Sequence, residues 1–150
     1  MKSIKKKIVT LFSVAFLLMS NTCLTANAST DDYYFNSFGI QPPSGNWSSL
    51  PSLYKETDSS IYLYLTSAMY PVYVKAEQGN NNITKNGNGQ PVSYVTCSQG
   101  IEYRIMNSAN VPGYVKLSFK SSQSYTGFTI TGCWSADWIN VQGHTYSLAY

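Results

Sequence analysis

Seven carboxylates and one histidine are the side chains of this sequence best suited to proton transfer near neutral pH. Glu77, Glu102 and Asp137 are candidates for the carboxylate pair of a glycoside hydrolase. His144 is the single histidine, and catalysis there would need a nucleophile and an orienting carboxylate beside it. Glu77 and Glu102 also alternate with basic residues, as solvated ion pairs between strands do. We therefore expect no enzyme activity and assign no catalytic residue, with an extracellular glycoside hydrolase kept as the last alternative.

The cysteines are the next candidates for chemistry. Of the three, Cys23 lies in a segment that we expect to be removed, which leaves Cys97 and Cys133. An even pair in an exported protein predicts a disulfide, and the rival interpretations are two free thiols or a metal pair. A metal site needs more ligands than two cysteines and one histidine provide. We therefore predict a Cys97–Cys133 disulfide, no metal and no cofactor.

The N-terminus has the three parts of a secretory signal peptide. Four lysines within residues 2–7 precede an apolar run from Ile8 to Met19, and Ala26-Asn27-Ala28 supplies a cleavage pattern of small residues. The run has 12 residues, whereas a membrane-spanning helix needs about 20, so we expect no stable membrane insertion. The predicted domains are a signal peptide at 1–28 and one β-sandwich domain at 29–150, secreted and then extracellular or associated with the cell surface.

The basic character of the chain resides in that leader. Ten basic and seven acidic residues give a charge of +3, but removal of four leader lysines leaves six basic residues against seven acidic ones, or −1. A domain of this charge is not expected to bind nucleic acid.

Apolar and polar residues alternate in many short segments, which predicts half-buried β-strands. In 114–120, Val115, Leu117 and Phe119 are expected to face the core, and Tyr114, Lys116 and Lys120 to face away. Such segments recur between turn signals with no convincing helix. We predict an all-β fold, a single-domain antiparallel β-sandwich or small barrel with one disulfide. The expected strands are 33–40, 61–68, 72–77, 92–97, 101–107, 114–120, 125–134 and 144–150. We expect 61–68 to pair with 72–77, and 92–97 to form a hairpin with 101–107. A bulge at Gly132 is expected to turn Cys133 inward, because unbroken alternation from Ile130 would place it on the opposite face.

Three short motifs stand in a recognisable order after the leader: Tyr54-Lys55-Glu56-Thr57, Gly113-Tyr114-Val115-Lys116-Leu117 and Gly132-Cys133-Trp134-Ser135-Ala136-Asp137. This order resembles a loose group of short, functionally uncharacterised, secreted β-rich proteins of Gram-positive bacteria that end near Gly-x-Trp-Ser-x-Asp. The resemblance implies export and an all-β fold, and it implies no activity. The chain departs from the group by continuing to Tyr150.

Aromatic residues are the feature with the most consequence for function, since all thirteen tyrosines follow the leader. Tyrosines opposite the aliphatic face of a strand can stack on sugars or dock a protein, or they can be buried against a second sheet. Trp134 and Trp138 can line a cleft or plug the end of the core. We predict a non-enzymatic binding protein for an unknown glycan or protein surface, with a bacteriocin-like or toxin-like effector as the alternative. The candidate ligand-binding residues are Tyr62, Tyr64, Tyr73, Trp134 and Trp138. If 61–68 pairs with 72–77, the three tyrosines form one exposed aromatic patch.

Overall fold

The protein is built from β-strands. The computed structural model describes residues 32–138 and 144–150, and within these ranges it contains no helix. The predicted all-β class with antiparallel sheets is confirmed. The strands are β1 (Tyr33–Ile40), β2 (Ser48–Ser49), β3 (Leu53–Lys55), β4 (Ile61–Ala68), β5 (Val72–Gln78), β6 (Asn81–Asn82), β7 (Thr84–Lys85), β8 (Val95–Cys97), β9 (Glu102–Asn107), β10 (Gly113–Ser121), β11 (Phe128–Ser135) and β12 (Ser147–Leu148).

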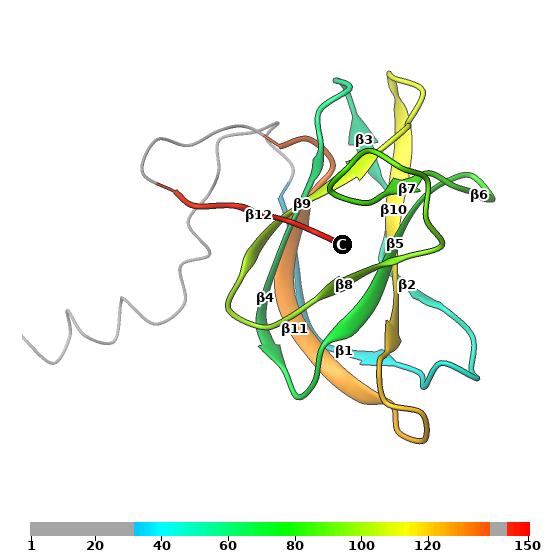
Figure 1. Cartoon of the computed structure of the whole chain (residues 1–150), viewed down its shortest axis with the longest axis vertical. Coiled ribbons are helices and arrows are strands. Elements are labelled where there is room, and N and C mark those ends of the chain that lie inside the picture. The colour runs from blue at the N-terminus through cyan, green and yellow to red at the C-terminus, as the bar shows by residue number, and fades with distance from the viewer. Residues whose placement is uncertain (1–31, 139–143) are drawn as a thin grey trace, which may run out of the picture.

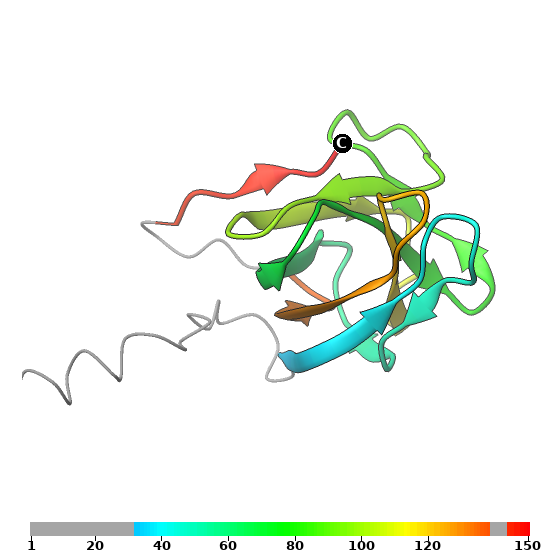
Figure 2. The same cartoon turned by 90° about the horizontal axis from the view of Figure 1, so that it is seen from below.

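The strands form two sheets that lie on either side of one core (Figure 1). Sheet I has the order β1-β11-β4-β9-β12, with β7 also paired to β9. Sheet II has the order β2-β10-β5-β6, with β3 also on β10 and β8 on β5. The pairing of β12 with β9 is parallel, and Figure 2 shows β12 in red beside β9, at the edge of sheet I away from the cyan β1. The arrangement is sandwich-like.

Strand β10 confirms the alternation expected for it. Val115, Leu117 and Phe119 are at most 1% exposed, whereas Tyr114 is 65% exposed. The Phe119 ring lies 6.0 Å from that of Phe35 and 6.1 Å from that of Phe38, both on β1. These contacts join the two sheets through the core, because β10 belongs to sheet II and β1 to sheet I.

A bulge in β1 brings both of its phenylalanines to the core. The register against β11 shifts between Phe35 and Phe38, and Ser37 there has a φ of 50°. Residues three apart in a regular strand point to opposite faces, so the extra residue restores Phe38 to the inner side. Phe38 accordingly packs against the core.

The expected pairing of consecutive strands is wrong in two places. We expected 61–68 to pair with 72–77, but β4 lies in sheet I and β5 in sheet II. We also expected a hairpin from 92–97 and 101–107, but β8 pairs with β5 and β9 pairs with β4. An alternating pattern requires only that one face be covered, and a strand meets that requirement equally well in either sheet.

The predicted Cys97–Cys133 disulfide is also wrong, because Cys97 is a free, buried thiol. Cys97 belongs to the core cluster, whereas Cys133 pairs with Tyr34 and Tyr64 on the outer side of sheet I. We expected a bulge at Gly132 to turn Cys133 inward. The register does shift there, but the extra residue is on β4, so β11 keeps its alternation and points Trp134 inward instead.

The burial of Cys97 predicts low reactivity in the folded protein. Desolvation raises the pKa of this thiol far above its ordinary value, so little thiolate is available to react. A maleimide should leave the Cys97 peptide unmodified in native protein and modify it fully in denaturant, as measured by mass spectrometry. Rapid labelling of native Cys97, or a linked Cys97–Cys133 peptide under non-reducing conditions, would contradict this.

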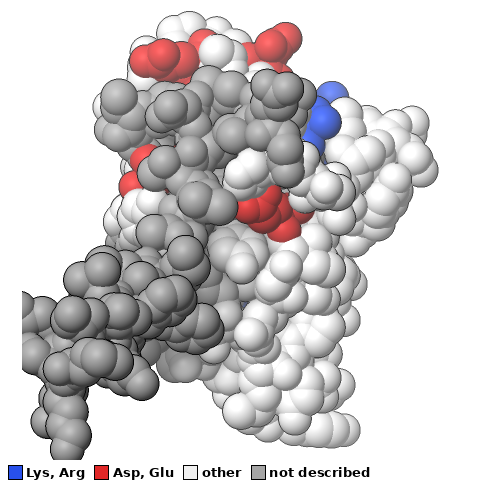
Figure 3. Space-filling model, turned by 90° about the vertical axis from the view of Figure 1, so that its left-hand side faces the viewer, with Lys and Arg blue, Asp and Glu red and all other residues white. Residues whose placement is uncertain are grey.

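Few charged side chains are visible among the described residues on the side of the molecule toward sheet I (Figure 3). Figure 3 shows that, outside the grey residues, this side is mostly uncharged, with acidic side chains near its top and centre and one small area of basic atoms. Among the residues that the structure describes, there is no helix with the length and hydrophobicity that a membrane crossing requires. The expected signal peptide, 1–28, lies outside the described residues.

Candidate functional site

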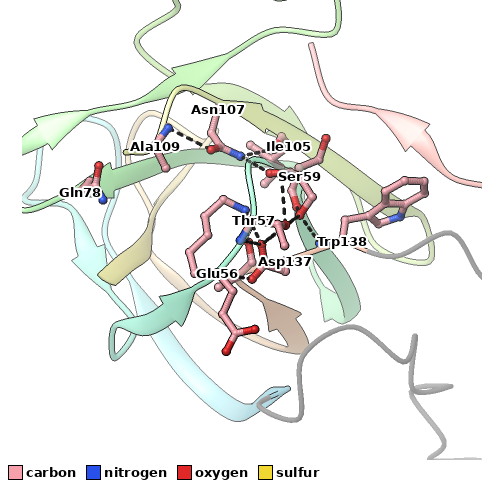
Figure 4. Close-up of polar contacts among 12 residues, drawn as sticks. Glu56, Thr57, Ser59, Gln78, Ile105, Asn107, Ala109, Asp137 and Trp138 are labelled. Atoms are coloured by element: carbon pink, nitrogen blue, oxygen red, sulfur yellow. Dashed lines mark hydrogen bonds and ion pairs between the residues drawn. The ribbon is translucent and has the colours of Figure 1, made fainter. Parts of the chain in front are cut away.

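The first and last of the three sequence motifs meet at a buried ion pair. The Nζ atom of Lys55 lies 3.0 Å from Oδ1 of Asp137, and it also donates a hydrogen bond to the carbonyl of Ala136 at 2.6 Å. Lys55 ends β3 of sheet II. Asp137, which is labelled in Figure 4, follows β11 of sheet I. Tyr54 faces outward, so the next residue, Lys55, points inward and is fully buried.

The loop after β3 completes the coordination of the Asp137 carboxylate. The backbone N–H groups of Glu56 and Thr57 donate to it at 2.8 and 3.2 Å. The hydroxyls of Thr57 and Ser59 donate at 2.6 and 3.0 Å. These four loop donors and Lys55 make five donors to the carboxylate, which therefore links the end of β11 in sheet I to the end of β3 in sheet II.

The same contacts set the protonation of the pair. Burial alone would raise the pKa of Asp137, but hydrogen bonds from Thr57, Glu56 and Lys55, with the charge of Lys55, lower this pKa to about 2. Burial lowers the pKa of Lys55, and the hydrogen bond and charge of Asp137 oppose that change. A carboxylate that stays ionised and saturated with donors is a poor general acid. The arrangement is suited to holding structure together.

Acid is expected to weaken the fold through Asp137. The carboxyl pKa is 3.8 ordinarily and about 2 in the folded protein, so the unfolded chain binds the proton first as pH falls. The contribution of Asp137 to stability is therefore complete above pH 3.8 and lost progressively as pH falls through about 2. Urea unfolding between pH 6 and pH 2 measures this loss. Thr57→Val, which removes one donor, should move the loss to higher pH, and an unchanged pH profile would contradict the assignment.

The three candidate carboxylates lie in separate environments. Asp137 is in the buried pair. Glu102 is on β9 of sheet I, and its Oε2 atom lies 3.2 Å from Nδ1 of His144. Glu77 lies on the outer face of sheet II, 2.8 Å from Nζ of Lys75. Burial would raise the pKa of Glu77, but hydrogen bonds from Lys75 and Ser118 lower it. No two of these three carboxylates face each other as a hydrolytic pair does.

Two of the candidate ligand-binding residues are buried, and a third is half-buried. Trp134 is fully buried in the core and fits the plug interpretation. Tyr62 is 2% exposed, packs edge-on against Tyr146 at 6.3 Å, and its pKa is raised, first by desolvation and then by Glu102. Trp138 is half-buried, with the guanidinium of Arg104 over its ring at 3.8 Å.

Tyr64 and Tyr73 remain half-buried at the surface, but on opposite sides of the protein. Tyr64 is on β4 of sheet I and Tyr73 on β5 of sheet II. The expectation that Tyr62, Tyr64 and Tyr73 form one exposed patch is therefore wrong, because it rested on the pairing of β4 with β5. Whether any of them contacts a ligand stays a prediction.

Tyr73 instead belongs to a different group of rings on the outer face of sheet II. Its ring lies 4.3 Å from that of Tyr94, and the Tyr94 ring lies 6.4 Å from that of Trp47. Tyr94 is 42% exposed, and Trp47 and Tyr73 are half-buried. We call Trp47, Tyr73 and Tyr94 the aromatic platform.

Two lysines hold Trp47 on this face. The Nζ atoms of Lys75 and Lys120 lie 4.7 and 5.1 Å from the centre of the Trp47 ring, within the range of cation–π attraction. Lys120 also donates a hydrogen bond to the carbonyl of Pro43 at 2.9 Å, which ties down the loop before Trp47. The platform is thus held at a fixed position over β5 and β10.

Sequence patterns could not have found Trp47, because it lies in an irregular segment before the short strand β2. Tyr94 lies within the expected strand 92–97, but β8 begins only at Val95. Within the described ranges, no group of three His, Cys, Asp or Glu side chains could hold a metal ion. Comparison with protein-family models, curated protein sequences and solved structures found no match for this chain.

Proposed function

We propose that this protein is a secreted, non-enzymatic binding protein that acts at or near the bacterial surface. We further propose that it binds a glycan on the aromatic platform. The observation that carries the proposal is the contact of Trp47, Tyr94 and Tyr73 in one partly exposed group on the outer face of a sheet. The predicted signal peptide supports secretion, and the separation of the three carboxylates supports binding over hydrolysis.

Both the area of the rings and their rigidity favour binding at the platform. Tryptophan and tyrosine offer a large apolar face at a low cost in side-chain entropy, and their polar atoms can remain hydrated. Lys75 and Lys120 fix Trp47 before any ligand arrives. Rings that are already ordered lose little freedom on binding, which favours stacking on the faces of sugar rings.

The test is binding of the purified protein to a glycan array and to whole Gram-positive cells. Trp47→Ala and Tyr94→Ala should each weaken binding about tenfold, as expected when one stacking contact of about 1.4 kcal/mol is lost. Circular dichroism should show that the fold survives, because neither ring is in the core cluster.

Tyr34→Ala is the matched control, because Tyr34 is 54% exposed on β1 of sheet I. It should bind like the wild type. The proposal would be wrong if no glycan or cell binds, or if Tyr34→Ala weakens binding as much as the platform variants do.

A further inference from the structure

The outer face of sheet II differs in charge from the rest of the protein. Lys75, Lys116 and Lys120 lie on it with one carboxylate, Glu77, so the face carries 3 − 1 = +2. Residues 29–150 as a whole carry six basic and seven acidic residues, or −1. Half of the basic residues that follow the leader are therefore gathered on the face that holds the aromatic platform.

Glu77 neutralises only part of this positive charge. Its Oε1 lies 2.8 Å from Nζ of Lys75, and its Oε2 lies 3.9 Å from Nζ of Lys116. Ser118 also donates a hydrogen bond to Oε2. Lys120 has a carbonyl and a tryptophan ring as its partners rather than a carboxylate. An anion that reaches this face would therefore meet ammonium groups whose positive charge is only partly neutralised.

We call Lys116, Lys75 and Lys120 the lysine row, and aromatic rings lie at both of its ends. Tyr114, Lys116 and Lys120 share one face of β10, and the six-residue step from Tyr114 to Lys120 spans about 20 Å. At the Tyr114 end, Tyr54 packs edge-on against Tyr114 at 5.2 Å, and the two are 40% and 65% exposed. At the Lys120 end lies the aromatic platform. The face thus runs from rings through positive charge to rings again.

We propose that the ligand is an acidic polysaccharide of carboxylate-bearing sugars, which lies along β10 from the Tyr54–Tyr114 pair to the aromatic platform. This inference rests on the proposed function and adds the charge, polymeric nature and direction of the ligand. Sugar rings stack on the aromatic side chains at both ends, and carboxylates between them pair with Lys116 and Lys120. A neutral glycan would leave the lysines without partners, and a polyanion without rings would not use the aromatic side chains.

The experiment measures the dissociation constants of three polymers: polygalacturonate, neutral dextran and inorganic polyphosphate. Polygalacturonate should bind at least tenfold more tightly than either of the others, and its affinity should fall as salt rises. Lys116→Gln and Lys120→Gln should each lower the affinity for polygalacturonate about fivefold and reduce its dependence on salt. Tyr114→Ala should lower the affinity for the polymer several-fold. It should leave the affinity for digalacturonate unchanged, because digalacturonate is too short to span the face.

Lys85→Gln is the matched control, since Lys85 lies on β7, which pairs with β9 in sheet I. It should bind polygalacturonate like the wild type. Tight binding of dextran that Trp47→Ala abolishes and Lys116→Gln leaves unchanged would overturn the acidic ligand but keep the proposed function. Binding of polygalacturonate unaffected by Trp47→Ala would overturn the platform itself. Equal binding of polyphosphate would show that charge alone acts and would overturn the sugar assignment.

Discussion

Replacing Asp137 with asparagine is expected to destabilise the protein by about 3 to 5 kcal/mol, the usual result of removing one partner of a buried ion pair. The cost arises at Lys55, which is fully buried and would lose the negative charge that neutralises its ammonium group, leaving only uncharged oxygens such as the Ala136 carbonyl as partners. The amide would also present one acceptor oxygen where two carboxylate oxygens now accept from the loop after β3. Urea unfolding at pH 7 measures the difference.

Glu56→Gln is the matched control for this variant. Glu56 precedes Thr57 in the same loop, but its side chain is exposed, and only its backbone N–H contacts Asp137. Its stability should stay within about 0.5 kcal/mol of the wild type. Lys55→Met should cost less than Asp137→Asn, because Asp137 would keep its hydroxyl and backbone donors. If Asp137→Asn lowers the free energy of unfolding no more than Glu56→Gln does, the Lys55–Asp137 pair does not hold the sheets together.

The strands themselves were predictable because their signal is local. In β10 and in β5, inward aliphatic residues alternate with outward polar ones, and the buried set Val72, Val74 and Ala76 follows that period. The sheet to which each strand belongs was not predictable, since the connection at Pro71 can either reverse a chain within a sheet or carry it to the opposite one. Choosing between them depends on contacts between residues far apart in sequence.

The prediction of a Cys97–Cys133 disulfide was wrong for a related reason. Counting cysteines predicts a bond only if both side chains reach the same space, and here Cys97 faces the core while Cys133 lies on the outer side of β11. The deciding feature is the extra residue of β4 opposite Gly132. A Cβ at Gly132 would lie 2.2 Å from the carbonyl oxygen of Tyr64, so the strands approach closely there. That approach is a tertiary property and leaves no periodic trace in the sequence.

The candidate site was predictable only in part. Tyr73 follows from strand periodicity, because it alternates with buried valines. Tyr94 also lies in an expected strand, but its contacts with Tyr73 and Trp47 do not follow from periodicity, and Trp47 is brought to sheet II by an irregular segment. Lys55 and Asp137 belong to motifs that the sequence offered, yet only the fold shows that these motifs meet. Alternation thus finds residues on a face, and the fold decides which faces come together.

Phe119→Ala is expected to destabilise the protein by about 3 to 5 kcal/mol, because it removes buried apolar surface and leaves a cavity. The ring is fully buried and contacts Phe35 and Phe38 of the opposite sheet, so little can move in to fill the space. Lys116→Ala, three residues earlier on the outer face of the same strand, should change stability by no more than about 0.5 kcal/mol. Urea unfolding of both variants at one pH measures the contrast. Equal losses would mean that β10 does not divide core from surface, and the lysine row and its proposed ligand would then lose the face on which both are placed.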